Sequence, residues 1–129
     1  MIINAKQALY YALTHDSTLT SLLGAGQRVY GSWPKSLDVM PCITFFVVSS
    51  NLEYAMSDRS VTEFQVDIWG LLSSTAVDQI AERIHVVLHR QIISISGEVK
   101  SFLCIVGQMR EGFEDDIRHV SMDITIHTQ

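Results

Sequence analysis

A chain of 129 residues has the size of one ordinary domain, so residues 1–129 are predicted to fold as a single unit with its own core. Hydrophobic residues make up 47% and charged residues 18%, a composition that argues against a disordered chain. The 9 basic and 14 acidic residues give a net charge of −5, which excludes the electropositive surface of a nucleic-acid-binding protein.

The two cysteines point to a reducing environment. Cys42 and Cys104 stand far apart, each inside an apolar run, with no CxxC pair and no metal-type spacing. This favours two buried thiols over a disulfide. The first residues lack the basic start and apolar core of a signal peptide, and no window approaches the ~18–20 apolar residues of a membrane span. We therefore expect the protein to be made and folded in a reducing cytoplasm.

Two helical patterns open the chain. Residues 4–14 place apolar side chains three and four positions apart, which predicts a helix with Asn4 as its N-cap. A shorter helix is predicted over Ser17–Leu23. It is followed by Gly24, in the position where a left-handed residue commonly ends a helix.

The following segments predict strands. Residues 28–30 indicate a short strand, and residues 31–40 a loop, because Trp33-Pro34 restricts the backbone. Residues 42–49 (CITFFVVS) are apolar on both faces, which predicts a strand in the centre of the sheet.

Residues 61–90 are the unit around which the predicted fold is organised. Over 62–69 apolar and polar residues alternate, which is the period of a half-buried strand. After Gly70 the period becomes that of a helix, for which Ser73 or Ser74 is the predicted N-cap. The apolar stripe of this helix consists of Val77, Ile80, Ala81, Ile84, Val87 and Leu88.

The C-terminal part predicts two more strands separated by an acidic loop. Residues 91–100 are predicted as a connection with a turn at Ser96-Gly97, and residues 102–106 as an apolar strand. Residues 108–116 are predicted as a loop that carries Glu111, Glu114, Asp115 and Asp116. The last strand, 118–128, turns Val120, Met122, Ile124 and Ile126 inward and His119, Ser121, Asp123, Thr125 and His127 outward.

Together these elements predict an α+β fold, a mostly antiparallel β-sheet with helices packed on one face. The other face is predicted to be polar, since Glu63, Gln65 and Asp67 point to it together with the outward residues of the last strand.

One histidine pair has the spacing of a metal site. His85 and His89 stand one helical turn apart, but Val86 takes the position of the glutamate in a zinc-binding HExxH helix. The pair is therefore interpreted as two exposed histidines beside an apolar stripe.

The remaining motifs do not predict catalysis. His119, Ser121 and Asp123 are triad residue types, but side chains along one strand do not converge on a common point. The acidic residues of 108–116 lack the EF-hand pattern, so a solvated loop is expected, with a weak divalent-ion contact between subunits as the alternative. We predict no catalytic, cofactor-binding or metal-binding residue, and a protein that is not an enzyme.

One connection favours assembly. Leu52, Tyr54 and Met56 alternate with Glu53 and Ala55 on a segment that should be exposed. Exposed apolar side chains on a small protein often mark a partner contact. A segment that folds back on its own core is the equal alternative.

Four stretches of the chain carry a resemblance. They are ALYYALTHDSTLTSLLG near the N-terminus, RVYGSWP followed by PCITF, TEFQVDIWG with a helix behind it, and the closing GFEDDIRHVSMDITIHT. With these motifs the chain resembles the tail-terminator (tail completion, or minor tail) family of long-tailed bacteriophages and related gene-transfer particles. The resemblance extends over almost the whole chain.

The resemblance implies a structural protein of the virion, assembled in the host cytoplasm and located at the head-proximal end of the tail. It implies a ring, usually a homohexamer, that binds the tail tube protein, stops tube polymerisation and offers a surface to the head-completion (neck) protein. DNA passes through such a ring without specific binding, which suits the negative charge. We expect Leu52, Tyr54, Met56 and Arg59 to contact a neighbouring subunit or the tube. We expect the channel to be lined by acids from among Glu63, Asp67, Glu111, Glu114, Asp115 and Asp116.

Two alternatives remain open at this stage. One is another neck protein of the same particle, such as a head-closure or adaptor ring. The other is a small ligand-binding or hydrolytic α+β domain, which would need a pocket with convergent polar groups.

Overall fold

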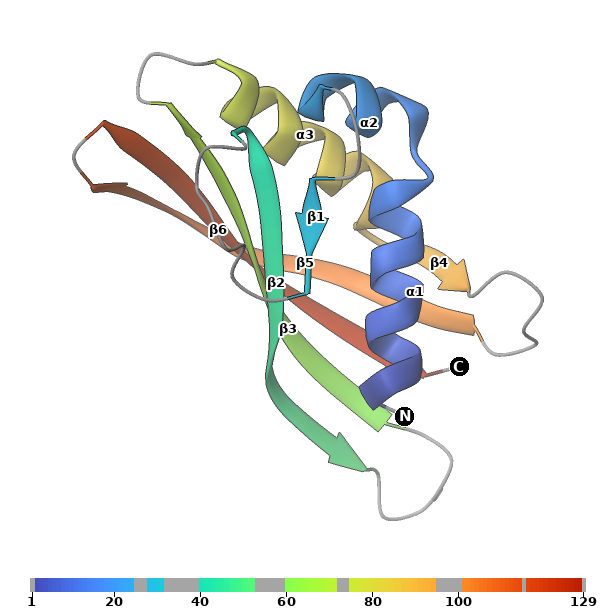
Figure 1. The fold of residues 1–129 in the computed structure, drawn as a ribbon. Coiled ribbons are helices and arrows are strands. Elements are labelled where there is room, and N and C mark those ends of the chain that lie inside the picture. The colour runs from blue at the N-terminus through green and yellow to red at the C-terminus, as the bar shows by residue number, and fades with distance from the viewer. Residues whose placement is uncertain are drawn as a thin grey trace.

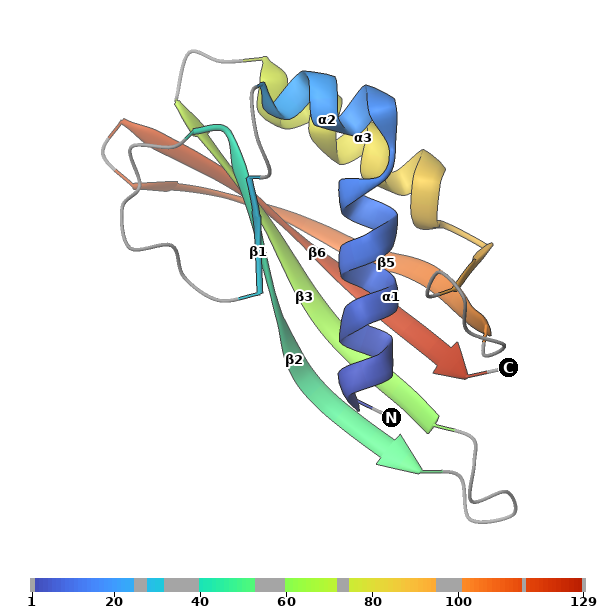
Figure 2. The same cartoon turned by 45° about the vertical axis from the view of Figure 1, so that its right-hand side comes forward.

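The computed structural model describes residues 2–24, 28–31, 40–52, 60–71, 75–94, 101–114 and 116–128. Three helices pack on one side of a six-stranded, mostly antiparallel sheet, which confirms the predicted α+β class (Figure 1, Figure 2). The sheet order is β1-β2-β3-β6-β5-β4, and among the described strands only the β1–β2 pair is parallel. The elements are α1 (Ile2–Thr14), α2 (Ser17–Leu23), β1 (Val29–Tyr30), β2 (Cys42–Leu52), β3 (Ser60–Leu71), α3 (Ala76–Leu88), β4 (Gln91–Ser94), β5 (Ser101–Glu114) and β6 (Ile117–Thr128).

The first two helices follow the sequence pattern closely. α1 begins at Ile2, two residues before the predicted start, and α2 has the predicted bounds. Asp16 is the N-cap of α2, and its carboxylate accepts a hydrogen bond of 2.9 Å from the backbone N–H of Leu19. Gly24 ends α2 with a φ of 92°, a conformation that favours glycine.

The unit formed by β3 and α3 is the centre of the fold. All but one residue of the predicted stripe of α3 are buried, and Val87 is partly buried. Gly70 lies against Val77, so closely that a Cβ atom at Gly70 would stand 2.3 Å from Cγ2 of Val77. The predicted N-cap was wrong: β3 runs to Leu71, α3 begins only at Ala76, and Thr75 occupies the cap position without a side-chain hydrogen bond.

Residues 42–49 form a strand as predicted, but this strand is not in the centre of the sheet. β3 and β6 occupy the centre, while β2 is bordered on its outer side only by the two-residue strand β1 among the described residues. Phe46 and Val48 are 43% and 56% exposed. The apolar run suggested a strand covered on both faces, whereas the helices cover only one.

The acidic loop predicted over residues 108–116 is a strand for most of its length. β5 extends to Glu114 and pairs with β6 down to Ile117, with a bulge between Val106 and Met109. Charged residues suggested a loop, but two arginines of this hairpin have carboxylate partners on the facing strand, as described below. The strand β4 was not predicted either, and the predicted turn at Ser96-Gly97 lies outside the described residues.

The core lies between the helices and one face of the sheet. The four inward residues predicted for the last strand are buried on this face, together with Phe64, Val66 and Ile68 of β3. Both cysteines are buried and free, as predicted. Burial raises the pKa of the Cys42 thiol to about 11 and that of Cys104 to about 12. None of the helices in the described part of the chain is long and apolar enough to cross a membrane.

Candidate assembly surface

The most prominent surface feature is a projecting hairpin. Residues 109–114 of β5 and 117–122 of β6, which we call the arm, extend past the helices, at the left of Figure 1 and Figure 2. Residues directly opposite each other in paired strands share a face of the sheet. Met109, Glu111 and Phe113 therefore lie on the same face of the arm as Arg118, and this is the face on which α3 packs.

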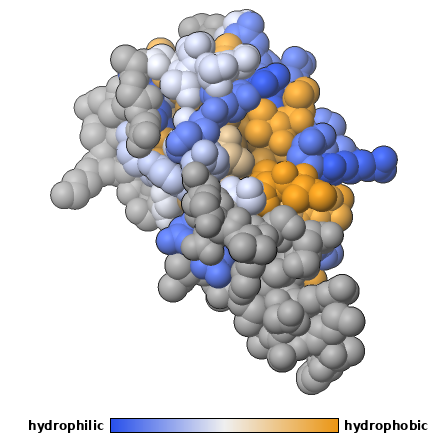
Figure 3. Space-filling view, turned by 90° about the vertical axis from the view of Figure 1, so that its right-hand side faces the viewer, coloured by the Kyte–Doolittle hydropathy of each residue, from blue (hydrophilic) through white to orange (hydrophobic). Residues whose placement is uncertain are grey.

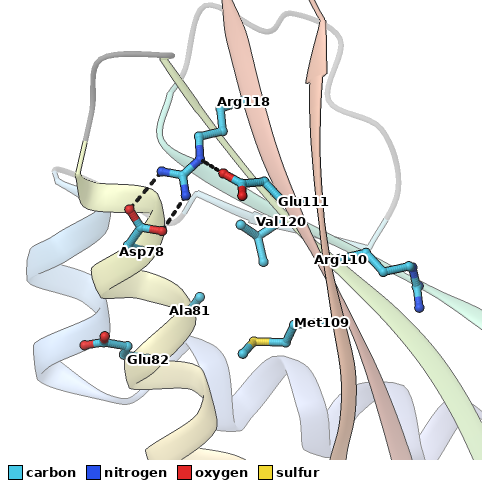
Figure 4. A pocket seen from close by; sticks show the side chains of 8 residues that line it. All are labelled: Asp78, Ala81, Glu82, Met109, Arg110, Glu111, Arg118 and Val120. Atoms are coloured by element: carbon cyan, nitrogen blue, oxygen red, sulfur yellow. Dashed lines mark hydrogen bonds and ion pairs between the residues drawn. The ribbon is translucent and has the colours of Figure 1, made fainter.

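Arg118 ties the arm to α3. Its guanidinium donates hydrogen bonds of 2.8 and 2.5 Å to the Asp78 carboxylate and one of 2.5 Å to Glu111 (Figure 4). The Arg118 side chain is only 15% exposed. Its hydrogen bonds lower the pKa of the Asp78 carboxyl, and the hydrogen bonds to Asp78 and Glu111 raise the pKa of Arg118 above its usual range. The arm is thus held in one orientation relative to the helix.

A groove of about 320 Å³ lies between α3 and the arm (Figure 4). Ala81, Met109 and Val120 supply its apolar surface. Among its charged residues, Arg118 binds Asp78 and Glu111, as described above. Arg110 donates two hydrogen bonds of 2.9 Å to Asp123, which lies outside the groove. A groove whose charges neutralise one another suits a contact surface better than a reaction centre.

The face of the sheet opposite the helices, which we call the open face, carries a hydrogen-bonded polar layer. The Ser121 hydroxyl donates to Asp67 at 2.5 Å, and Gln65 donates to the same carboxylate at 3.0 Å. The Trp69 indole N–H donates to the Thr44 hydroxyl at 3.0 Å. These bonds satisfy polar groups that are almost fully buried on this face.

The three residues with triad chemistry do not form a triad. Ser121 is bonded to Asp67, Asp123 to Arg110, and the His119 ring stacks on Trp69 with 4.6 Å between the ring centroids. Each side chain has a different neighbour, as expected for residues along one strand.

The two histidines of α3 also take structural roles. The His85 and His89 rings stack at 4.6 Å, and Nδ1 of His89 accepts a hydrogen bond of 3.1 Å from the backbone N–H of Val106. His85 is exposed and His89 half-buried. In the ranges of the chain that the structure describes, no group of three metal-ligating side chains comes together.

The predicted channel acids are distributed over different surfaces. Glu63 is exposed on the open face, where its carboxylate accepts a hydrogen bond of 3.1 Å from Ser49, whereas Asp67 is only 5% exposed. Glu111 lies on the helix side of the arm, and Asp116 is exposed in the turn at its tip. Glu114 ends β5 and its side chain is not described, while Asp115 lies outside the described residues.

Of the predicted contact residues, only Leu52 belongs to the described part of the chain, at the end of the sheet opposite the arm. Leu52 is the last residue of β2, opposite Ser60, and its side chain is not described. Tyr54, Met56 and Arg59 belong to the connection 53–59, which lies outside the described residues.

Sequence reasoning missed the apolar side chains of the arm. Met109 is 51% and Phe113 60% exposed, and both lie on the face that also carries Arg118. The period-two spacing of Met109, Glu111 and Phe113 was the signal that could have identified this strand. Another apolar area, bordered by hydrophilic residues, is visible on the side of the molecule where α1 and β4 lie (Figure 3). The 65% exposed Ile92 belongs to β4.

A second concave surface lies beside α1. A pocket of about 610 Å³ is lined by Lys6, Gln7, Tyr10, Tyr11, His15, Gly31 and Phe45. Three of these residues are aromatic, and the Tyr11 and His15 rings stack at 3.8 Å. The described residues of the lining include one lysine and no acid, in contrast to the acidic arm.

Comparisons with known proteins agree with this fold. A chain in the virion of a native gene transfer agent (GTA) particle matches with a TM-score of 0.76 and 13% identity, over 98% of this chain and 96% of that chain. A second solved protein, known only by a sequence identifier, matches with a TM-score of 0.64 and 13% identity, over 97% and 93%. At this identity the two likenesses concern the fold. A search of curated proteins finds no match. The model of one family, described as tail completion protein gp17, matches residues 7–129, and the chain therefore belongs to this family of structural proteins of the phage tail.

Proposed function

We propose that the protein is a tail terminator. It forms a closed ring, a homohexamer, on the head-proximal end of the tail tube, stops tube polymerisation and presents the surface that joins the tail to the head. The observation that carries this proposal is the family match over residues 7–129. The exposed apolar side chains of the arm support it, because such side chains on a small protein commonly mark contacts with partners.

The two ends of the molecule receive separate roles in this proposal. The end of the β2–β3 hairpin, with Tyr54, Met56 and Arg59 in its connecting sequence, contacts the tube protein. The opposite end carries the arm, which contacts a neighbouring subunit in this proposal. A ring needs both kinds of contact, since it must close on itself and also bind the tube.

The open face of the sheet is proposed to line the channel. Of the predicted acids, Glu63 is exposed on this face, while the Asp67 carboxylate is held inside the polar layer by Ser121 and Gln65. A surface that presents carboxylates repels the phosphates of passing DNA. Arg110 reaches this face, but its guanidinium is bound to Asp123.

A tube-capping assay tests the function. Purified tail tube protein is allowed to polymerise with and without this chain, and tube length and end occupancy are measured by electron microscopy. We expect capped tubes of limited length, with a ring on one end. The double variant Tyr54→Ala/Met56→Ala should form rings and fail to cap.

Two results would contradict the proposal. Tubes that elongate freely in the presence of the wild-type protein would exclude a terminator. Binding to portal-filled heads, combined with no binding to tubes, would instead identify a head-closure or adaptor ring.

A further inference from the structure

The arm and the pocket beside α1 have complementary surfaces. At the tip of the arm Phe113 is 60% exposed, and Asp116 carries an exposed carboxylate. Arg118 lies directly opposite Phe113, but its guanidinium is held by the carboxylates of Asp78 and Glu111. The pocket has aromatic walls formed by Tyr10, Tyr11 and Phe45 and an exposed lysine, Lys6, at its edge. An exposed apolar side chain near an exposed carboxylate therefore matches an apolar pocket with a basic edge.

We infer that the arm of one copy inserts Phe113 into the pocket beside α1 of a second copy. The inference rests on the proposed ring and names the contact that closes it. In this contact Phe113 packs against the aromatic walls, and the exposed carboxylate of Asp116 faces Lys6 of the neighbouring copy. The pocket is large enough, since cavities of ~300–1,000 Å³ accommodate whole organic ligands.

The arm cannot fill the pocket of its own chain. Phe113 is in register with Arg118 and Gly70, whereas Phe45 of the pocket is in register with Val66. Four residues along β3 and three strand spacings separate the two positions, which amounts to roughly 20 Å at ~3.3 Å per residue and ~4.8 Å per strand. Pairing with β6 and the hydrogen bonds of Arg118 hold the arm in place. The contact is therefore between copies.

The resulting interface is heterologous. Each copy offers one arm and one pocket on different parts of its surface, so one contact does not satisfy both copies. Such a head-to-tail interface adds copies until the rotation closes a ring. A copy that has only a functional pocket can therefore bind a copy that has only a functional arm, and assembly should end at this heterodimer.

The proposed contact is tested with one variant of the arm and one variant of the pocket, both at exposed residues. Phe113→Ala removes the arm side chain, and Lys6→Glu/Gln7→Glu places two negative charges at the pocket, against the acids of the arm. Ile92→Ala is the matched control, since Ile92 is a comparably exposed apolar residue at 65% that takes no part in the contact. Circular dichroism checks that every variant is folded.

Native mass spectrometry over a concentration series measures the oligomeric state in solution, and electron microscopy shows whether rings form on tube ends. We expect wild-type and Ile92→Ala to form rings, and both test variants to remain monomers or to need at least about ten times more protein to assemble. An equimolar mixture of the two test variants should give a 1:1 heterodimer and no ring.

The outcomes separate this interface from the proposed function. Test variants that form rings at the wild-type concentration would overturn the interface and leave the terminator proposal standing. An effect of the pocket variant alone would show that the tube or a small ligand occupies the pocket, and this would overturn the interface as well. If the wild-type protein forms no ring in solution or on tubes, both proposals fail.

A cross-link gives an independent measurement. Asp116→Cys combined with Gln7→Cys keeps Phe113 in place and should yield a ladder of disulfide-linked oligomers on oxidation, because the two introduced thiols of neighbouring copies would lie at the same contact. The pair Ile92→Cys with Gln7→Cys should yield none. A ladder of equal intensity from both pairs would contradict the specific contact.

Discussion

Asp16 shows how one residue can stabilise two levels of the structure. Its carboxylate caps α2 through Leu19 and also accepts hydrogen bonds of 2.7 and 2.8 Å from Arg83 of α3. The Asp16 side chain is 16% and the Arg83 side chain 33% exposed. The pKa of Asp16 is lowered mainly by the hydrogen bonds from Arg83. The hydrogen bond from Leu19 lowers it further, whereas burial raises it. In the sequence, Asp16 is only a residue between the two predicted helices, residues 4–14 and Ser17–Leu23.

We predict that Asp16→Ala destabilises the protein by about 1–2 kcal/mol at pH 7. A lost N-cap costs ~0.5–2 kcal/mol, and a partly exposed ion pair contributes up to ~1 kcal/mol. Asp16→Asn should cost less, since asparagine still caps the helix. Urea denaturation measures both differences in the free energy of unfolding.

The stabilisation that Asp16 contributes is expected to depend on pH. Because the pKa of Asp16 is lower in the folded than in the unfolded state, its stabilisation is present above the unfolded carboxyl pKa of ~3.9 and is lost as the pH falls through the folded value. The difference between wild type and Asp16→Ala should therefore shrink in acid. A difference at pH 3 as large as that at pH 7 would contradict this account.

At the scale of elements, the contact between β3 and α3 depends on the absence of a side chain at Gly70. A Cβ atom there would lie 2.3 Å from Val77, whose side chain is fully buried. We predict that Gly70→Ala costs ~1–3 kcal/mol through overpacking. Gly70→Ala/Val77→Ala should cost less than the sum of the two single changes, because the smaller residue 77 makes room.

A double-mutant cycle by urea denaturation measures this coupling. Gly107→Ala is the control, since its nearest neighbour, the Asp123 carbonyl oxygen, would be 3.5 Å from the new Cβ, an ordinary contact. Additive effects of the changes at Gly70 and Val77 would show that the close approach is relieved by movement of the backbone.

The elements that the sequence predicted correctly are those with a regular local period. α2, the stripe of α3 and the inward face of the last strand each repeat one pattern over several residues. β4 and the outer half of β5 were missed because their stability comes from pairing with strands distant in the sequence. The position of β2 was misjudged because an apolar run does not reveal whether both faces are covered.

The candidate site was harder to predict than the fold for the same reason. The sequence identified the acids of the arm tip and the apolar connection after Leu52, but it assigned the arm to a loop. Without the strand, Met109 and Phe113 could not be placed on one face, and the partner of Arg118 on α3 could not be known. The pocket beside α1 combines residues from a helix and from the β1–β2 edge, which no local pattern connects.

At the scale of the whole molecule, the two sides of the sheet are suited to different neighbours. The helix side holds the core, the hydrogen bonds of Arg118 that fix the arm, and the pocket. The open face carries the polar layer with Glu63 at its surface, beside exposed apolar side chains such as Phe46. A ring built from such subunits can turn its helices outward and its polar face towards the DNA. The charge of the open face then determines how freely DNA moves.

We predict that Glu63→Lys slows DNA passage without preventing assembly. In the proposed homohexamer the six lysines on the open face would hold phosphates, so particles with this variant should have normal tails and heads but deliver DNA at least about tenfold less efficiently. The defect should weaken as ionic strength rises, since salt screens contacts with phosphate.

Gln79→Lys, which adds an exposed lysine on α3, is the control for added charge away from the channel and should deliver DNA normally. Electron microscopy of the particles and a DNA-delivery assay separate the steps. Delivery at the wild-type rate by Glu63→Lys particles would show that another surface lines the channel, and loss of the rings would show that Glu63 supports the structure instead.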